Sequence, residues 1–333
     1  EPSRAMNTNA VNWSELKTAC YSRSMQVIDL TGTEYTVGDQ ITFRNSATIR
    51  GTSTSYITGG TTSLTPFYND KSGLTITFMN VKFKNMDVNN LLQLYGTNIF
   101  INCSFENITT ANDHNSIIWN EQGSMEITGC NFTNNHVNFG AVTNYDDVSS
   151  DIPEMSVENC KFINNTATSE PGAINNCGNL DVTSSEFINN TASLWAGAIH
   201  THYNSNTVIH NSNFTNNVAL WNGGALYTYC NLSIYNSNFN SNWCNKSAGG
   251  GAIGCSNWVS SYNILVEDCT FEDNFNNNSL QNETPATGCG GAISAMNDGV
   301  LDVHGSTFIN NYAAFGQAIA AYSLGYVNIT AGI

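Results

Sequence analysis

The sequence predicts an all-β protein, a right-handed parallel β-helix of roughly 10 to 12 turns, with three short strands per turn and a short N-terminal capping helix. Three observations predict this fold. A segment centred on a phenylalanine recurs nine times, apolar residues around it alternate with a period of two, and asparagine-rich corners interrupt the alternation. Self-similarity at a period of roughly 20 to 50 residues is typical of a solenoid.

The recurring phenylalanine aligns the repeats. Its nine copies are Phe83, Phe105, Phe132, Phe162, Phe187, Phe214, Phe239, Phe271 and Phe308. The positions seven and five residues earlier are mostly apolar, as at Met155 and Val157. Apolar residues two apart point to the same side of a strand, so this segment predicts a first strand with one buried face.

Polar columns predict the corners between strands. Three residues before each phenylalanine stands Asn, Asp, Ser or Gly, types that tolerate left-handed backbone or form local turns. The next position is small, and we predict that it points inward with the phenylalanine on a second strand. A second corner follows, such as Asn164-Asn165 or Asn189-Asn190, and a third strand then begins with Gly-Ala-apolar, as at 197–199.

A short helix is expected near the N-terminus. It begins behind Asn12 or Ser14 as the N-cap and places Trp13, Leu16 and Cys20 on one stripe. The first turn of a β-helix exposes strand edges and apolar core. We therefore interpret this helix as a lid over the open end.

The repeat runs through most of the chain and indicates one β-helix domain. Residues 1–10 are expected to be a loose lead-in, and 1–26 comprise this lead-in and the capping helix. The parallel β-helix occupies 27–333, with phenylalanine repeats from about residue 74. The absence of an initiator Met or signal peptide suggests a processed or trimmed chain.

Unequal repeat lengths predict loops on a regular scaffold. The spacing between successive phenylalanines runs from 22 residues (83 to 105) to 37 residues (271 to 308). Strands cannot lengthen without losing register, so the surplus must form loops, where recognition usually occurs. We expect them at 145–154, 243–249 and 275–290, the last two as neighbours in successive turns.

Composition excludes several classes of partner. Of 333 residues, 26 are acidic and 10 basic, giving a net charge of −16. Such a chain repels nucleic acid and anionic lipid. No stretch approaches the roughly 18 to 20 apolar residues of a membrane span. We expect neither a nucleic-acid partner nor a membrane span.

The repeat motif resembles a known group of surface proteins. The alternation of F-x-x-N with G-G-A-[ILV], over 187–199 (where Ala196 replaces the first glycine) and 214–226, resembles the repeats of chlamydial polymorphic outer-membrane proteins and of archaeal adhesin-like proteins. The resemblance covers roughly residues 75–330 and implies a β-helix at the cell surface. Departures occur at 92–94, 117–119 and 317–319, where the Gly-Ala-apolar triplet is missing.

Ten cysteines indicate an oxidising compartment. We predict a Cys244–Cys289 bridge between the two neighbouring loops, and a Cys230–Cys255 bridge because both residues follow Gly-Ala-apolar in successive turns. Another four cysteines occupy the inward column of small residues, where we expect them to fill the core as free thiols. Cysteines of this column in successive turns would also lie within disulfide range. The four are Cys103, Cys130, Cys160 and Cys269.

N-x-[ST] sequons predict N-glycosylation of an exported chain. The predicted acceptors are Asn102, Asn107, Asn131, Asn164, Asn189, Asn213, Asn231, Asn245, Asn277, Asn282 and Asn328. Asn131 and Asn213 immediately precede an inward phenylalanine and should point outward. Asn107, Asn164 and Asn189 lie in the second corner, where a glycan would be sterically free.

The sequence contains few residues in patterns typical of catalysis or metal binding, and we predict no catalytic residue, metal or cofactor. The sequence contains no Cys-x₂-Cys pair, the spacing that is typical of a zinc site. An acidic loop offers hard oxygen ligands for calcium, but we interpret it as solvated; it contains Asp146, Asp147, Asp151 and Glu154. His200 and His202 share a strand face and could form half a metal site, yet with only His210 nearby we predict structural or solvent-facing histidines.

Two function classes remain open. We favour an extracellular, glycosylated, non-enzymatic surface protein, an adhesin-like stalk or filament subunit that contacts itself or cell-surface glycans and proteins. The alternative is a polysaccharide-active lyase or glycoside hydrolase with an unrecognised site, but all four arginines precede the repeats. A strand-like end at 326–330 suggests head-to-tail assembly. Four tryptophans recur near the third strand, at Trp195, Trp221, Trp243 and Trp258. If exposed, they would form a strip that stacks on sugars, but the sequence is equally compatible with their packing under loops.

Overall fold

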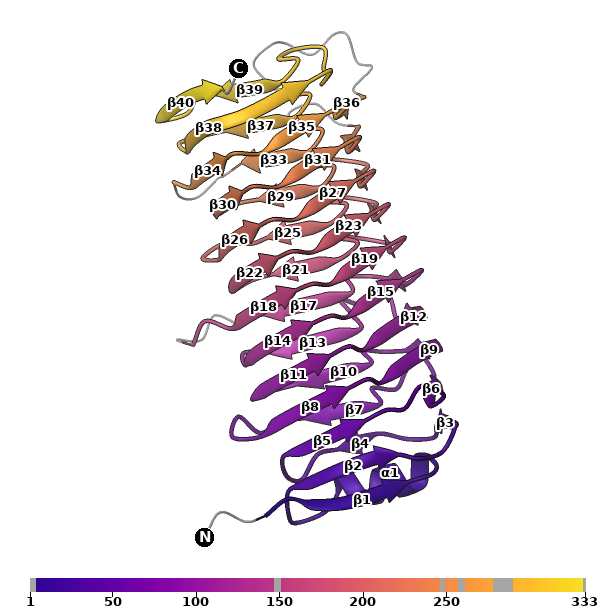
Figure 1. Ribbon diagram of the computed structural model, residues 1–333. Helices are drawn as coiled ribbons and strands as arrows, with labels where there is room; N and C mark the ends of the chain where they lie inside the picture. The colour runs from indigo at the N-terminus through magenta and orange to yellow at the C-terminus, as the bar shows by residue number, and fades with distance from the viewer. Residues whose placement is uncertain (1–3, 147–150, 246–248, 257–260, 278–289, 332–333) are drawn as a thin grey trace.

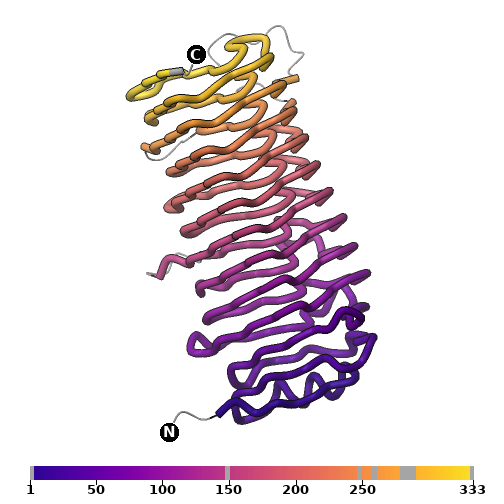
Figure 2. The backbone as a smooth tube through the Cα atoms, in the orientation of Figure 1, coloured from indigo at the N-terminus to yellow at the C-terminus, as the bar shows by residue number. Residues whose placement is uncertain are grey.

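The computed structural model describes residues 4–146, 151–245, 249–256, 261–277 and 290–331. These residues form an elongated parallel β-helix of about 11 turns, with one short helix near the N-terminus (Figures 1 and 2). The predicted fold class is confirmed. Among the described residues every strand pair is parallel and joins equivalent segments of successive turns. The register of one turn is repeated in the next, except for shifts between Ile57 and Gly59 and between His304 and Ser306.

The first strands of the turns form one continuous face, which we call the first sheet. Its register carries the predicted apolar columns, for example Met155 opposite Leu180 and Val157 opposite Val182. The strands are β1 (Met6–Ala10), β2 (Gln26–Leu30), β5 (Ala47–Arg50), β8 (Thr75–Met79), β11 (Thr97–Ile101), β14 (Ser124–Thr128), β18 (Glu154–Glu158), β22 (Asn179–Thr183), β26 (Asn206–His210), β30 (Asn231–Tyr235), β34 (Asn263–Glu267), β38 (Val300–Ile309) and β40 (Tyr326–Ala331).

The second sheet carries the phenylalanine column and is more broken than predicted. In the middle turns a residue with positive φ, such as Asn164 (φ 57°) or Asn189 (φ 55°), divides it into two short strands. The strands are β3 (Glu34–Val37), β6 (Tyr56–Gly59), β9 (Lys82–Val88), β12 (Ser104–Thr110), β15 (Asn131–Thr133), β16 (His136–Val137), β19 (Lys161–Ile163), β20 (Thr166–Ala167), β23 (Glu186–Ile188), β24 (Thr191–Ala192), β27 (Asn213–Thr215), β28 (Val218–Ala219), β31 (Asn238–Asn240), β32 (Trp243–Cys244), β35 (Thr270–Glu272), β36 (Phe275–Asn276) and the end of β38.

The third sheet follows the Gly-Ala motif. The segments that lack this motif, at 92–94, 118–121 and 319–322, nevertheless pair in the same register. The strands are β4 (Ile41–Thr42), β7 (Phe67–Asn69), β10 (Leu92–Leu94), β13 (Ile118–Glu121), β17 (Val142–Tyr145), β21 (Ile174–Asn176), β25 (Ile199–Thr201), β29 (Leu226–Thr228), β33 (Ile253–Ser256), β37 (Ile293–Met296) and β39 (Ile319–Tyr322).

The nine phenylalanines stack face to face inside the β-helix. Neighbouring rings from Phe83 to Phe308 lie 4.5 to 5.0 Å apart between centroids, with interplanar angles of 6° or less. All but Phe308 have no exposed surface. The repeat register is therefore confirmed. Offset stacking of this kind adds about 0.5 to 1.5 kcal/mol per pair beyond the burial of apolar area.

The corner before the phenylalanine has left-handed backbone, as its residue types predicted. Values of φ there lie between 47° and 64°. The residues are Asn80, Asn102, Gly129, Asn159, Ser184, Asn211, Asn236, Asp268 and Gly305. Asparagine is among the few side chains that adopt this region at low cost. The column thus sets the bend between the first and second sheets.

A second interior ladder consists of asparagines at the corner after the phenylalanine. The Nδ2 of Asn190 donates to the carbonyl oxygen of Phe162 (2.9 Å) and to Oδ1 of Asn217 (3.0 Å), and equivalent bonds recur in the turns from Asn135 to Asn274. The ladder comprises Asn135, Asn165, Asn190, Asn217, Asn242, Asn274 and Asn311. The sequence identified this corner, but not that its second asparagine is buried.

The N-terminal segment differs from the predicted loose lead-in. Met6–Ala10 forms strand β1, which pairs in parallel with β2 and continues the first sheet below residue 27. Its side chains are mostly exposed, so no apolar pattern predicted it. The strand forms because backbone groups at the edge of β2 require hydrogen-bond partners.

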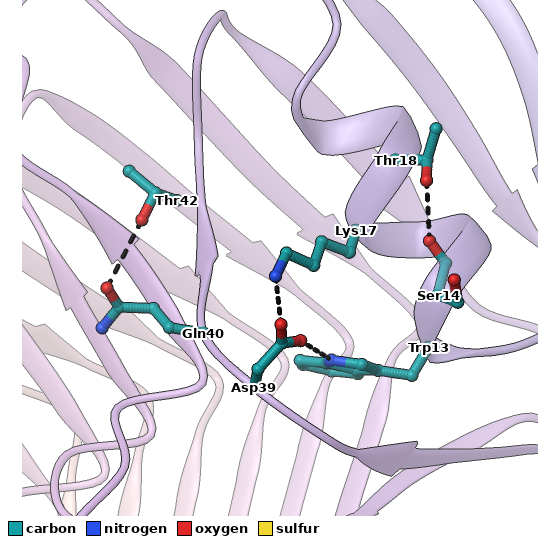
Figure 3. Close-up of polar contacts among 7 residues, drawn as sticks. All are labelled: Trp13, Ser14, Lys17, Thr18, Asp39, Gln40 and Thr42. Atoms are coloured by element: carbon teal, nitrogen blue, oxygen red, sulfur yellow. Dashed lines mark hydrogen bonds and ion pairs between the residues drawn. The ribbon is translucent and has the colours of Figure 1, made fainter.

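Helix α1 (Trp13–Cys20) confirms the predicted lid. Asn12 is the N-cap, and its Oδ1 accepts a hydrogen bond from the Glu15 backbone N–H (2.9 Å). Trp13 meets Phe67 edge to face at 5.3 Å, so the helix seals the first turns. Figure 3 shows Asp39 receiving both the Trp13 indole N–H and the Lys17 ammonium group.

Candidate functional site

A shallow depression of about 360 Å³ lies on the outer face of the first sheet, across β14, β18, β22 and β26. Three exposed carboxylates line it, Glu126, Glu154 and Asp181. Glu126 and Asp181 both pair with Ser156, so they are two turns apart, or about 10 Å along the solenoid axis. The Oε1 of Glu154 accepts a hydrogen bond from Asn179 (2.7 Å). Carboxylates on nearby turns are the feature that a glycoside hydrolase would require.

The predicted acidic loop is only partly described. Asp147 lies outside the described residues, Asp146 is partly buried and Asp151 is exposed. Glu154 belongs to strand β18 and contributes to the depression.

The predicted glycan acceptors lie on the surface wherever the structure describes them. Asn131 and Asn164 are exposed and Asn213 is partly exposed. Further exposed or partly exposed acceptors are Asn102, Asn107, Asn189, Asn231, Asn245, Asn277 and Asn328. Asn282 lies outside the described residues. All described acceptors are therefore placed where a glycan could project from the rod.

Of the two predicted disulfides, the structure describes both cysteines of only one. Cys230 and Cys255 are both unbridged thiols. The register pairs Cys255 with Thr228, so Cys230, two residues further on, does not lie opposite it. The predicted Cys230–Cys255 bond is therefore absent from the structure. Cys289 lies outside the described residues, whereas Cys244 is buried in β32.

The inward cysteine column behaves as core filler. The backbone N–H of Cys103 lies 3.4 Å from the sulfur of Cys130, and that of Cys130 lies 3.4 Å from the sulfur of Cys160. All three are buried thiols, as is Cys269 in the same column. The hydrogen bond with the Cys130 thiol, and then burial, raise the pKa of Cys160 far above its ordinary value, so this sulfur is protonated and unreactive.

The described tryptophans do not form one exposed strip. Trp221 is 41% exposed, and its ring meets that of the less exposed Trp195 edge to face at 5.8 Å. Trp195 also stacks on Tyr227 at 6.0 Å, and Trp243 stacks on Phe275 at 5.7 Å. Trp258 lies outside the described residues. Packing accounts for most of their ring surface.

A buried polar cluster lies on the outer side of the third sheet. The register aligns Thr143, Asn175, His200 and Tyr227 in one column that alternates with the core column of Ile174. This column should face solvent, yet its four residues are buried. The segment that precedes β21 contributes to this burial, because the Oε2 of Glu170 lies 3.5 Å from Nδ1 of His200. The sequence prediction missed this burial.

Three potential ligands converge within the cluster. One atom each from Glu170, His200 and His202 lies within 4.8 Å of the other two. The Nδ1 of His200 is 3.5 Å from Oε2 of Glu170, and the rings of His200 and His202 are 4.0 Å apart between centroids. The sequence paired the two histidines but not Glu170. The signal that could have found it is a lone carboxylate in the segment just before β21, one turn below the histidines.

Burial controls the charge of this cluster. It raises the pKa of the Glu170 carboxyl to about 8 and lowers the pKa of His202 to about 4. For His200, burial and then the charge of His202 hold the pKa well below its ordinary value. All three groups are therefore neutral near pH 7 without a cation. The contact between His200 and Glu170 is consequently not a charged pair.

Comparison with known proteins supports the repeat. The family model of the Chlamydia polymorphic membrane protein repeat matches residues 211–229. The chain thus resembles β-helical proteins of the chlamydial polymorphic membrane protein type, as its motif predicted. No match was found among curated proteins.

Solved structures with related shapes include both enzymes and an adhesin. The catalytic domain of a GH87 alpha-1,3-glucanase has a TM-score of 0.44 and 12% identity, over 99% of this chain and 68% of that chain. PfbA, a surface adhesin of Streptococcus pneumoniae, has a TM-score of 0.41 and 10% identity, over 99% and 93%. The alginate lyase AlyF-OU02 has a TM-score of 0.39 and 12% identity, over 98% and 89%. Likenesses this distant carry no argument about what this chain does.

Within the part of the chain that the structure describes, no helix has the length and hydrophobicity needed to cross a bilayer.

Proposed function

We propose that this chain is the rigid rod of an extracellular, glycosylated, non-enzymatic surface protein, acting as an adhesin-like stalk or a structural subunit. The uninterrupted interior is the observation that supports this proposal. Phenylalanine rings stack from Phe83 to Phe308, and an asparagine ladder runs beside them from Asn135 to Asn311. A rod that copies one register from turn to turn resists bending, and such rigidity holds a binding surface away from a cell.

The surface chemistry supports polar partners. With 26 acidic and 10 basic residues, the rod repels nucleic acid and acidic surfaces. Many of its outward positions hold Asn, Ser and Thr, as in the column of Ser124, Asn179 and Asn206, where Ser124 and Asn206 are exposed and Asn179 is partly exposed. Such side chains form hydrogen bonds to glycans or to protein surfaces. Cell-surface glycans and proteins are therefore the partner classes that we propose.

A second candidate function is polysaccharide cleavage in the depression on the first sheet. Glu126, Glu154 and Asp181 supply carboxylates on three successive turns, and this arrangement favours the alternative. All three are exposed to solvent, whereas the general acid of a glycosidase usually lies in a partly apolar pocket. The described lining of the depression also contains no basic residue that could stabilise an acidic sugar. The rod without catalysis therefore remains the preferred proposal.

An assay of polysaccharide cleavage separates the two functions. The chain is incubated with neutral and acidic polysaccharides, including α-1,3-glucan and alginate, and both new reducing ends and retention on the immobilised polymers are measured. We expect no reducing ends from the wild type, and no difference from the double variant Glu126→Gln/Asp181→Asn. Release of reducing ends by the wild type that disappears in the double variant would instead establish the enzyme.

Glycosylation is tested on native material. Glycopeptide mass spectrometry is expected to find N-glycans on at least one of Asn131, Asn164 and Asn213, because these side chains are exposed or partly exposed in short strands and corners. A matched negative site is Asn165, which is buried and lies in no sequon. Unmodified peptides at all three acceptors would contradict the glycoprotein part of the proposal.

A further inference from the structure

We propose that Glu170, His200 and His202 bind one divalent transition-metal ion, with Zn²⁺ as the best match, beneath the segment that precedes β21. This site goes beyond the proposed rod function. It would link two successive turns, because Glu170 precedes β21 in one turn, whereas His200 lies in β25 of the next turn and His202 directly follows that strand.

The donor set matches the chemistry of zinc. Zinc takes imidazole nitrogen at about 2.0 to 2.1 Å and carboxylate oxygen at about 2.0 to 2.2 Å, and two histidines with one glutamate form a well-established ligand set for it. In tetrahedral geometry, bonds of this length place neighbouring donor atoms about 3.3 Å apart. The three donors already lie within 4.8 Å of one another. Small side-chain rotations would bring them to bonding distance.

Unsatisfied polar atoms are the second observation that indicates a ligand. Both ring nitrogens of His200 and Oε2 of Glu170 are buried and have no hydrogen-bond partner. His200 is 0% and Glu170 is 7% exposed. Each buried polar atom without a partner costs about 1 to 3 kcal/mol. A cation bound between a carboxylate oxygen and imidazole nitrogens would convert this cost into coordination bonds.

Asn175 orients one of the proposed ligands. Its Oδ1 lies 2.6 Å from Nε2 of His202. A hydrogen on Nε2 donates to that oxygen, so the lone pair of His202 resides on Nδ1 and is available for a metal. Metal-ligating histidines usually donate their second N–H to a carbonyl or carboxylate in this way. We therefore assign Asn175 as a positioning residue.

The alternative is a neutral packed cluster. His200 contacts the rings of Trp195 (6.0 Å) and Tyr227 (5.4 Å), as a core histidine would. A neutral cluster gains nothing from a cation, because burial alone already removes its charges. Added zinc would then leave the stability of the protein unchanged. The metal site and the neutral packed cluster therefore differ in whether zinc raises the stability of the protein.

The test compares zinc binding and thermal stability in the full chain after chelator treatment. We expect one tightly held Zn²⁺ per chain by elemental analysis after dialysis, and a rise in Tm when Zn²⁺ is restored. Glu170→Gln preserves side-chain shape and the neutral state but removes the anionic donor. Its zinc affinity, measured by competition with a chromogenic chelator, is expected to fall at least tenfold, as is that of His202→Asn.

Two controls keep the outcome specific. His210→Asn changes a histidine on the outer face of the first sheet, where the imidazole stacks on Tyr235, and should leave zinc affinity unchanged. After chelator treatment, the Tm of Glu170→Gln should be no lower than that of the wild type. This result would show that the variant has lost a metal ligand and has kept its fold. Equal zinc affinity in wild type and Glu170→Gln would overturn the site. These results are independent of the polysaccharide assay, since its carboxylates lie on another sheet.

Discussion

Replacing Phe187 by alanine is expected to lower the free energy of unfolding by about 3 to 5 kcal/mol. The ring is fully buried and lies 5.0 Å from that of Phe162 and 4.7 Å from that of Phe214. Its removal opens a cavity in the middle of the stack. The neighbouring rings cannot close it because each is fixed by its own strand. Denaturant unfolding followed by circular dichroism measures the loss.

The neighbouring residue provides the control for Phe187. Ile188 follows it in β23 but points outward and is only partly buried, so Ile188→Ala should cost markedly less. Phe187→Leu retains part of the volume and should fall between the two. Equal losses at Phe187 and Ile188 would show that the ring stack adds no stability of its own.

The second large effect is expected at Asn190. Asn190→Ala removes hydrogen bonds to the Phe162 carbonyl and to Asn217, and two more that its Oδ1 accepts from the backbone N–H and Nδ2 of Asn165. Buried groups stranded in this way cost about 1 to 3 kcal/mol each, so we expect a loss of about 3 kcal/mol or more in the same unfolding measurement.

Two further variants separate hydrogen bonding from volume. Asn190→Leu restores volume without polar atoms and should remain destabilised, because the stranded partners are unchanged. Asn238→Ala breaks an asparagine–asparagine contact of 2.9 Å on the exposed face and should change stability by less than about 0.5 kcal/mol. Recovery of full stability in Asn190→Leu would show that the ladder matters for packing alone.

The sequence predicted those parts of the fold that depend on local alternation. The columns of Phe162, Met155 and Val157 were identified because residues two apart on a strand share a face, and the parallel register then follows from repetition. The corner of Asn159 was identified because few side chains adopt positive φ at low cost. The direction of each side chain therefore follows from rules that act within one turn, and only the register requires that the repeats be aligned.

Features that depend on contacts between turns could not be predicted. Asn165 looks like an ordinary turn residue, and its burial appears only when Asn135 and Asn190 stack on either side. Glu170 is one carboxylate in a connecting segment, and its meeting with His200 requires that segment to fold over the third sheet. Both results are set by the stacking of turns, which a single repeat does not encode.

Because the turns between Asn135 and Asn274 reproduce the same interior columns, the turn is an interchangeable unit of length in this part of the rod. The column positions of Phe187 and Asn190 recur at Phe214 and Asn217, so the end of one turn fits the beginning of any other that carries the same columns. A gene encoding such a chain can gain or lose whole turns by recombination between repeats without disturbing those that remain. Each exchange would change the reach of the molecule by about 4.8 Å, so its span is adjustable in discrete steps.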